Sequence, residues 1–131
     1  LYYIQGYHLA YFDKEIVHDE FQAWLHGPVS RKLYDSLKDK STIHTELMYV
    51  QNVDEENIGD IMKSKLTSDQ LSLVDEVLEM LWKYSGFELE EFTHGETPWI
   101  EARQWFRPWD RCENVISKDS IKAFFKTRIY A

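Results

Sequence analysis

Residues 1–12 read LYYIQGYHLAYF, and this stretch decides the fold. It carries no charged side chain, and its apolar and aromatic groups would cover nearly every side of a helix. A helix that is apolar all round is normally buried. We therefore predict a first helix that runs through the core and ends at Asp13 and Lys14. The stretch lacks an initiator Met and a basic leader, so we expect a truncated N-terminus rather than a signal peptide.

The segment that follows gives weaker signals. Residues 15–26 fit a strand and a helix equally well, because both alternate positions and one helical face are apolar. Gly27-Pro28 then breaks the chain, and Pro28 is suited to start a new helix. Residues 41–52 are predicted to be a connector with some extended character. The apolar face of the helix after Pro28 would hold Val29, Leu33, Tyr34 and Leu37.

Hydrophobic staples, in which apolar residues flank a capping residue, predict three later helix starts. They lie at Asp54, Thr67 and Ser117. At Thr67 the side chain of Gln70 would complete a capping box. Thr97-Pro98 predicts a fourth start, with a hydroxyl cap before a proline.

The longest series of apolar residues at helical spacing predicts a helix that Gly86 would end. About six helices emerge along residues 1–131, which we predict to form one mainly α domain around the buried first helix. A short β-hairpin or extended connectors would complete it. The apolar positions of the longest series are Leu71, Val74, Leu78 and Leu81.

Composition and charge narrow the class of protein. The chain has 131 residues and a formal net charge of −8, which argues against general binding to nucleic acid or anionic membranes. No uncharged apolar run reaches the roughly 20 residues of a membrane span. A single cysteine, Cys112, suits a reducing cytoplasm, and we expect a buried thiol there. Residues 46–101 hold 14 acidic and 3 basic side chains, whereas residues 102–131 hold 3 acidic and 7 basic ones.

The residues that could carry chemistry form no recognisable catalytic, cofactor or metal motif. The five histidines lie far apart, and a single cysteine is too few for a cysteine-rich zinc site. His18-Asp19-Glu20 and His94-Gly95-Glu96 could each supply a base with a carboxylate beside it. A small hydrolase or transferase that uses His94 with Glu96 is one alternative function. We expect no catalytic residue, cofactor or metal.

Arginines alternate with aromatic residues over residues 103–111, RQWFRPWDR. Three interpretations stay open. The segment could be a loop folded over the core with its arginines paired to the acidic middle of the chain. It could be a protein interface, since Trp and Arg are enriched at hot spots. It could also bind single-stranded nucleic acid, which would fit a phage-encoded regulator, although the net charge disfavours this.

The order of several short motifs resembles the Panacea domain of SocA-like antitoxins and of phage-associated, GepA-like proteins. The resemblance begins at Gln5-Gly6-Tyr7-His8-Leu9-Ala10 and continues through Ala23-Trp24, Gly27-Pro28-Val29 and Tyr34. In the second half it runs through Leu89, Thr93-His94, Pro98-Trp99, Ala102-Arg103, Ile116-Ser117, Ile121 and Phe124.

The resemblance implies a bacterial or prophage antitoxin, without enzymatic activity, that neutralises a protein toxin by binding it in the cytoplasm. In the SocA-like case the antitoxin also delivers its toxin to a protease, which suggests a Clp-type machine as a second partner. The segment from Gln104 to Asn114 is longer than the family pattern, so we expect it to be specific to this protein.

The motif residues are expected to be structural. His94 in particular is expected to link its helix to a neighbouring backbone group. The structural set is Gly6, Tyr7, His8, Trp24, Gly27, Pro28, His94, Pro98 and Trp99.

Two surfaces are candidates for the contact with the toxin. One is acidic and suits a basic active site; the other is aromatic and basic. The acidic candidates are Asp54, Glu55, Glu56, Glu90 and Glu91, and the others are Trp105, Arg107, Trp109 and Arg111.

Overall fold

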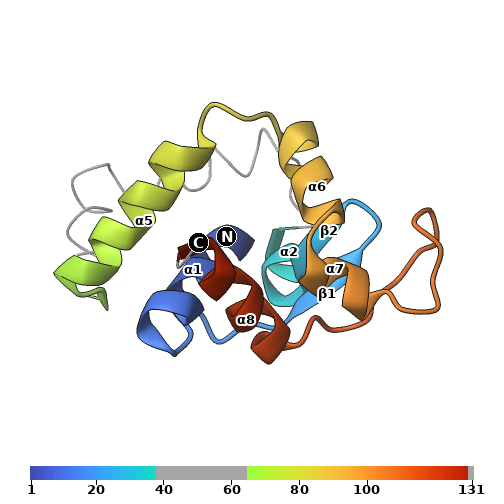
Figure 1. Ribbon diagram of the computed structural model, residues 1–131, viewed down its shortest axis with the longest axis horizontal. Coiled ribbons are helices and arrows are strands. Elements are labelled where there is room, and N and C mark those ends of the chain that lie inside the picture. The colour runs from blue at the N-terminus through green and yellow to red at the C-terminus, as the bar shows by residue number, and fades with distance from the viewer. Residues whose placement is uncertain (38–64, 130–131) are drawn as a thin grey trace.

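The computed structural model describes residues 1–37 and 65–129. Within these residues the chain is mainly α, as predicted, with six helices and one antiparallel pair of strands. None of the described helices is both long and apolar enough to span a membrane. In chain order the elements are α1 (Tyr2–Phe12), β1 (Phe21–Trp24), β2 (Gly27–Ser30), α2 (Arg31–Leu37), α5 (Ser68–Leu81), α6 (Gly86–His94), α7 (Thr97–Ala102) and α8 (Lys118–Ile129), labelled as in Figure 1.

Helix α1 lies in the middle of the molecule, which confirms the predicted buried first helix (Figure 1). It packs mainly against α8 and α5. Gly6 allows the close approach to α8, because a Cβ atom there would lie only 2.3 Å from the ring of Phe125. The helix ends at the predicted place: Asp13 adopts a left-handed conformation (φ 58°), and its N–H donates to the carbonyl of Leu9.

The ambiguous segment before Gly27 forms a hairpin. Strand β1 pairs with β2, and Trp24 lies opposite Gly27, whose φ of 116° favours glycine. The predicted helix start at Pro28 is wrong, since Pro28 lies in β2 and α2 begins only at Arg31. A proline is tolerated on an edge strand, because its missing backbone N–H is not needed there for a hydrogen bond to a neighbouring strand. The cap of α2 is instead Ser30, whose hydroxyl accepts from the N–H of Leu33 at 3.2 Å.

A third segment covers the outer edge of β1. The N–H of Ala23 donates to the carbonyl of Asn114 at 2.8 Å, and the N–H of Ile116 donates to the carbonyl of Phe21 at 2.7 Å. The chain thus returns to the hairpin just before α8 begins, so residues 104–113 form an excursion that starts and ends close to β1.

Two of the predicted helix starts are confirmed by their capping bonds. The N–H of Gln70 donates to Thr67 Oγ1 at 3.1 Å, and Gln70 Oε1 accepts from the N–H of Thr67 at 2.8 Å, which completes the capping box of α5. At α8, Ser117 Oγ accepts from the N–H of Ser120 at 3.3 Å. The predicted start at Asp54 and the connector 41–52 lie outside the described residues.

Two other predictions near α6 and α7 are wrong in detail. Helix α5 ends at Leu81, and Gly86 begins α6 instead of ending a helix. Ser85 caps α6, and this local bond takes precedence over the tendency of glycine to stop a helix. Helix α7 begins at Thr97, and its N-cap is Glu96, without a capping bond from its side chain.

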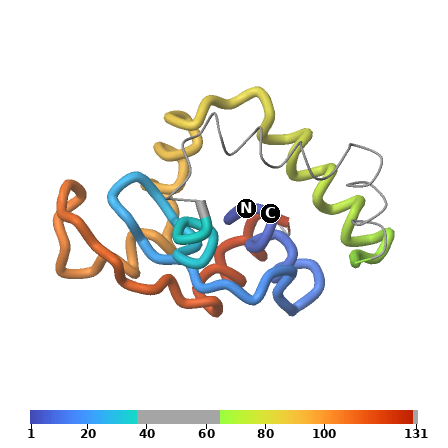
Figure 2. The backbone as a smooth tube through the Cα atoms, turned by 180° about the vertical axis from the view of Figure 1, so that it is seen from behind, coloured from blue at the N-terminus to red at the C-terminus, as the bar shows by residue number. Residues whose placement is uncertain are grey.

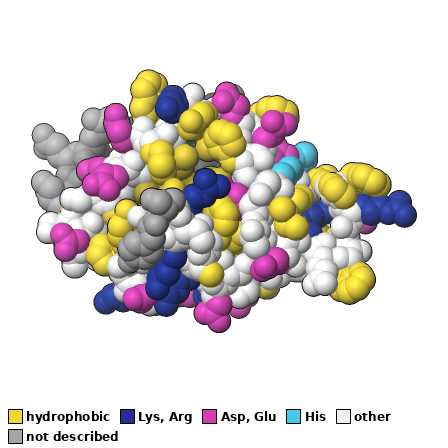
Figure 3. Space-filling model, in the orientation of Figure 1, with side chains coloured by type: hydrophobic (Ala, Val, Ile, Leu, Met, Phe, Trp, Pro, Cys, Tyr) yellow, Lys and Arg dark blue, Asp and Glu magenta, His cyan; other side chains and the backbone are white. Residues whose placement is uncertain are grey.

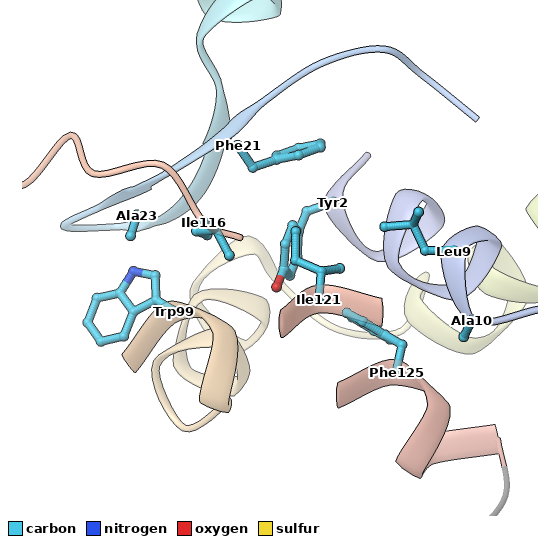
Figure 4. Packing of buried hydrophobic residues seen from close by; sticks show 9 residues of the cluster. All are labelled: Tyr2, Leu9, Ala10, Phe21, Ala23, Trp99, Ile116, Ile121 and Phe125. Carbon is cyan, nitrogen blue, oxygen red and sulfur yellow. The ribbon is translucent and has the colours of Figure 1, made fainter. Parts of the chain in front are cut away.

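The core is formed by side chains of α1, the hairpin, α7 and α8 (Figure 4). The ring of Tyr2 meets those of Phe21 and Phe125 edge to face, with centroids 5.4 and 5.9 Å apart. Cys112 is buried, as expected. The core cluster is Tyr2, Leu9, Ala10, Phe21, Ala23, Trp99, Ile116, Ile121 and Phe125.

Candidate functional site

The segment Gln104–Asn114, here called the tryptophan loop, projects from the body of the molecule between α7 and α8 (Figures 1 and 2). Its aromatic side chains face solvent: Trp105 is 92% exposed, and Phe106 and Trp109 are also exposed. Large aromatic side chains are normally buried, so this cluster is a candidate contact surface.

Arg103 holds the base of the tryptophan loop. Its buried guanidinium donates to the carbonyls of Ala23 (2.9 Å), Arg107 (2.8 Å) and Asp110, and it lies 4.8 Å from the ring centre of Trp99. One planar group with several donors therefore binds a carbonyl of β1 and two carbonyls of the loop at once.

This geometry corrects the interpretation that the arginines of the loop pair with the acidic middle of the chain. Arg103 bonds to backbone carbonyls, the guanidinium of Arg107 lies 5.7 Å from the ring centre of Trp109, and Arg111 forms an ion pair with Glu113 at 3.6 Å. Within the described part of the chain these partners lie in the loop, in the hairpin or, for the Trp99 ring that Arg103 covers, in α7.

The loop is ordered by further local bonds. The carboxylate of Asp110 accepts from the N–H of Arg107 at 3.0 Å, and the side-chain amide of Asn114 donates to the carbonyl of Ala102 at 3.0 Å. Trp105 adopts a φ of 79°, a left-handed conformation that a bulky residue seldom takes. A strained backbone that displays an exposed tryptophan is more typical of a functional loop than of a passive connection.

Glu90 and Glu91 are the two acidic candidates among the described residues, and both lie on α6. The carboxylate of Glu90 accepts from Nδ1 of His26 at 2.8 Å and lies 3.9 Å from Nε2 of His94. Glu91 is exposed. The other acidic candidates, Asp54, Glu55 and Glu56, lie outside the described residues.

The pair proposed for an enzyme, His94 and Glu96, makes no mutual hydrogen bond in the described part of the chain. The ring of His94 stacks on Trp99 at 4.2 Å, and its Nε2 atom is buried without a hydrogen-bond partner there. The predicted link from His94 to a backbone group is therefore wrong, because stacking holds the ring. Among the same residues no group of three His, Cys, Asp or Glu side chains could hold a metal.

Buried polar motif residues join α1 to its neighbours. His8 Nδ1 donates to the carbonyl of Lys14 (2.6 Å), and His8 Nε2 accepts from the amide of Gln70 (3.0 Å). The amide oxygen of Gln70 is engaged by Thr67, so its nitrogen must face the histidine, which assigns the neutral Nδ1–H tautomer. Gln5, which our candidate set does not include, accepts from the N–H groups of Ile16 and Val17 at 3.1 Å each.

The aromatic motif residues line the core and the hairpin. Trp99 is only 5% exposed, and its indole N–H donates to the carbonyl of Trp24 at 2.9 Å. Trp24 is half-buried and meets Tyr34 edge to face. Tyr7 meets Phe125 at 4.8 Å, and Pro98 is buried in the first turn of α7.

A cavity of about 490 Å³, here called the tyrosine pocket, opens between α1, α5, α6 and α8. Glu96 lies in it and is more than nine-tenths buried. One carboxylate oxygen accepts from the hydroxyl of Tyr3 at 2.7 Å, whereas Oε1 has no hydrogen-bond partner among the described residues. Burial raises the pKa of this carboxyl, and the Tyr3 bond and the Arg128 charge oppose that rise. The aromatic walls are Tyr3, Tyr7, Tyr84, Phe92, Phe124 and Phe125.

Sequence reasoning did not find the tyrosine pocket. Its walls come from α1, from the consecutive helices α5 and α6, and from α8, and no short motif predicts such a site. The nearest signal in the sequence is Glu96, which the pattern suggests only as a partner of His94. A second cavity, of about 560 Å³, lies between Tyr2, β2, α2 and α6 and has mainly apolar walls. Neither cavity contains both His94 and Glu96.

Comparison with known proteins supplies the family. Residues 1–100 match the family model described as "Antitoxin SocA-like, Panacea domain". No curated protein and no solved structure matches the chain significantly. The match ends before the tryptophan loop. The resemblance over Ile116-Ser117, Ile121 and Phe124 therefore stays a prediction. Because the model covers well over half of the sequence, the chain belongs to the SocA-like antitoxin family that carries the Panacea domain.

Proposed function

We propose that this protein is a non-enzymatic antitoxin that neutralises a cognate protein toxin by direct binding in the bacterial cytoplasm, and that the tryptophan loop is its main contact. The family match supports an antitoxin role in general. The observation that carries the finer proposal is the exposure of Trp105 and Trp109 on a loop whose backbone is fixed by Arg103.

The physical basis is occlusion by an ordered surface. Buried Trp and Arg side chains dominate the affinity of many interfaces, because each covers a large area with few rotatable bonds. A loop that is already ordered loses little further entropy on binding. Nanomolar affinity corresponds to about −12 kcal/mol, which a standard interface with a few such anchors provides.

Co-expression with the neighbouring open reading frame tests this function. We expect that the neighbour alone arrests growth of a bacterial host and that the wild-type protein restores it. The double variant Trp105→Ala/Trp109→Ala should lose the rescue and weaken the purified complex at least about 100-fold, as loss of hot-spot residues does. The matched control is Trp82→Ala, since Trp82 is also exposed (74%) but lies at the end of α5.

The outcomes separate two errors. If the double variant binds the toxin as tightly as the wild type does, the tryptophan loop is not the contact. If the wild-type protein neither rescues growth nor forms a complex with the neighbour's product, the proposed pairing is wrong, and a pull-down from the native host must supply the partner.

The acidic side chains would act on the rate of association. Many toxins act on nucleotides or RNA and have basic active sites, which a negative surface attracts over a distance. Charge reversal at Glu90 and Glu91, or at Asp54, Glu55 and Glu56, should slow association and flatten its dependence on salt. An unchanged association rate at low salt would remove these residues from the contact.

Delivery of the toxin to a Clp-type protease is the second partner function that we propose. It predicts that the toxin's half-life in cells falls when this protein is present and recovers in a protease-deficient strain. Equal half-lives in both strains would show that binding alone neutralises the toxin.

A further inference from the structure

We infer that the tyrosine pocket receives a basic side chain, arginine or lysine, of a protein partner, with Glu96 as its counter-ion and the aromatic rings as its walls. The inference rests on the proposed function insofar as the partner is the toxin. It deepens that function by naming what the partner must offer.

Glu96 is the first reason. Its Oε2 atom is held by the hydroxyl of Tyr3 at 2.7 Å, which fixes the orientation of the carboxylate. Its Oε1 atom is buried with no hydrogen-bond partner in the described part of the chain, where Glu96 also forms no ion pair. A buried carboxylate without a cation is costly, and such groups usually have a partner. An N–H donor of a bound cation would complete its bonds.

The walls are the second reason. Aromatic rings attract a cation that lies over their faces within about 6 Å. Tyr84 and Phe92 meet edge to face at 4.9 Å, and Phe124 and Phe125 do so at 5.2 Å, so neighbouring rings present faces in different directions. The pocket's volume of about 490 Å³ is enough for a long side chain.

Arg128 shows that the mouth of the pocket already attracts a cation. Its guanidinium carbon lies 5.0 Å from the ring centre of Phe124, and burial raises the pKa of Glu96 while the charge of Arg128 opposes that rise. Arg128 is nevertheless exposed and makes no ion pair with Glu96. We therefore regard it as a competitor of the incoming side chain at the rim.

The surroundings favour a positive ligand over a neutral or acidic one. Glu91 lies at the rim, and Met80 joins the pocket to an acidic patch on α5 that contains Asp75, Glu76 and Glu79. Figure 3 shows hydrophobic side chains gathered on this face between α5 and α6, with acidic side chains toward the edges and Lys or Arg side chains among them.

The test uses N-acetyl-arginine methylamide as the probe and nuclear magnetic resonance of the full chain as the readout. We expect saturable shifts at the pocket tyrosines, with a millimolar dissociation constant, and at least tenfold weaker binding of the uncharged citrulline analogue. Glu96→Gln should weaken probe binding at least tenfold. Arg128→Gln should strengthen it severalfold, because it removes the competing cation. Glu113→Gln is the matched control, since Glu113 lies outside this pocket and should not affect binding.

Glu96→Gln keeps the shape of the side chain and can still accept the bond from Tyr3, so we expect it to fold. If it melts at or above the wild-type temperature and loses the probe, the carboxylate serves binding. Equal binding by Glu96→Gln, or by the citrulline analogue, would overturn the inference. So would a toxin complex whose affinity Glu96→Gln leaves unchanged. A wild-type protein that binds the probe but no toxin would contradict the proposed function alone.

Discussion

Trp99 and Trp105 lie six residues apart in the sequence and in opposite environments. Trp99 is buried against the hairpin, with its N–H bonded to the carbonyl of Trp24 and its ring covered by Arg103 and His94. Trp105 lies in the tryptophan loop with almost its whole side chain in solvent and its backbone in a left-handed conformation.

The difference separates the residues that hold the fold from those that we propose as the contact with a partner. In the α1–α8 core each large side chain touches others, and Gly6 leaves no room for a methyl group. The tryptophan loop is held by the Arg103 guanidinium and by the carboxylate of Asp110, whereas the rings of Trp105 and Trp109 are exposed. We expect substitutions in the core to change stability and substitutions in the loop to change binding.

The largest expected effect is that of Trp99→Ala. Removing this buried ring leaves a cavity and an unpaired carbonyl on Trp24, and it should lower the free energy of unfolding by about 3–5 kcal/mol. Trp105→Ala should change it by less than about 0.5 kcal/mol. Urea denaturation of both variants measures the contrast. Similar losses in the two variants would show that the loop is part of the core.

Arg103→Met comes next, since Arg103 belongs to both regions. The variant leaves three carbonyls without their charged donor and should lower the free energy of unfolding by about 2–3 kcal/mol. Amide hydrogen exchange should rise in the tryptophan loop more than in α1. Arg103→Lys is the control that keeps the positive charge. Its single ammonium group cannot bond to all three carbonyls as the planar guanidinium does. Unchanged exchange in the loop would show that the local bonds suffice to order it.

Gly6→Ala should have a smaller effect, about 1–2 kcal/mol of destabilisation. The added methyl group would contact the ring of Phe125 at 2.3 Å and push α1 from α8, although alanine favours the helix itself. Gly86→Ala is the matched control, because a Cβ atom there meets nothing within 4 Å. If Gly6→Ala were as stable as the wild type, the two helices could separate at little cost.

The smallest effect concerns Glu96 and depends on pH. Because burial raises its pKa in the folded state, Glu96 favours folding most at low pH, and this contribution is lost as the pH rises through the raised pKa. Glu96→Gln does not titrate there, so it should exceed the wild type in stability by about 1 kcal/mol at pH 7 and by less near pH 4. Unfolding curves at both pH values measure this. A difference that grows as the pH falls would contradict it.

Much of the fold could be predicted from local patterns. The uncharged segment 1–12 had to be buried, and the Thr67 and Ser117 caps follow from side chains that bond to the nearest backbone. The hairpin was less clear, because the pattern of residues 15–26 suits two structures. Only the pairing with β2 and with residues 114–116 decides for a strand.

The candidate site was harder to predict. The tryptophan loop was visible as a cluster of residue types, yet the role of Arg103 depends on carbonyls that strand β1 and the loop bring together. The tyrosine pocket depends on four helices meeting around one carboxylate, and the sequence shows these residues only as unrelated aromatic positions.

The backbone of Ala23 has a consequence for how this protein can change. Its carbonyl accepts from Arg103 and its N–H donates to Asn114, so both ends of the tryptophan loop are tied to one residue of the sheet. Insertions between these ends would add only a small closure cost, about 0.6 kcal/mol for a doubling of length. On the function proposed above, we expect sequences grafted between Arg103 and Asn114 to alter the choice of toxin while the rest of the fold stays the same.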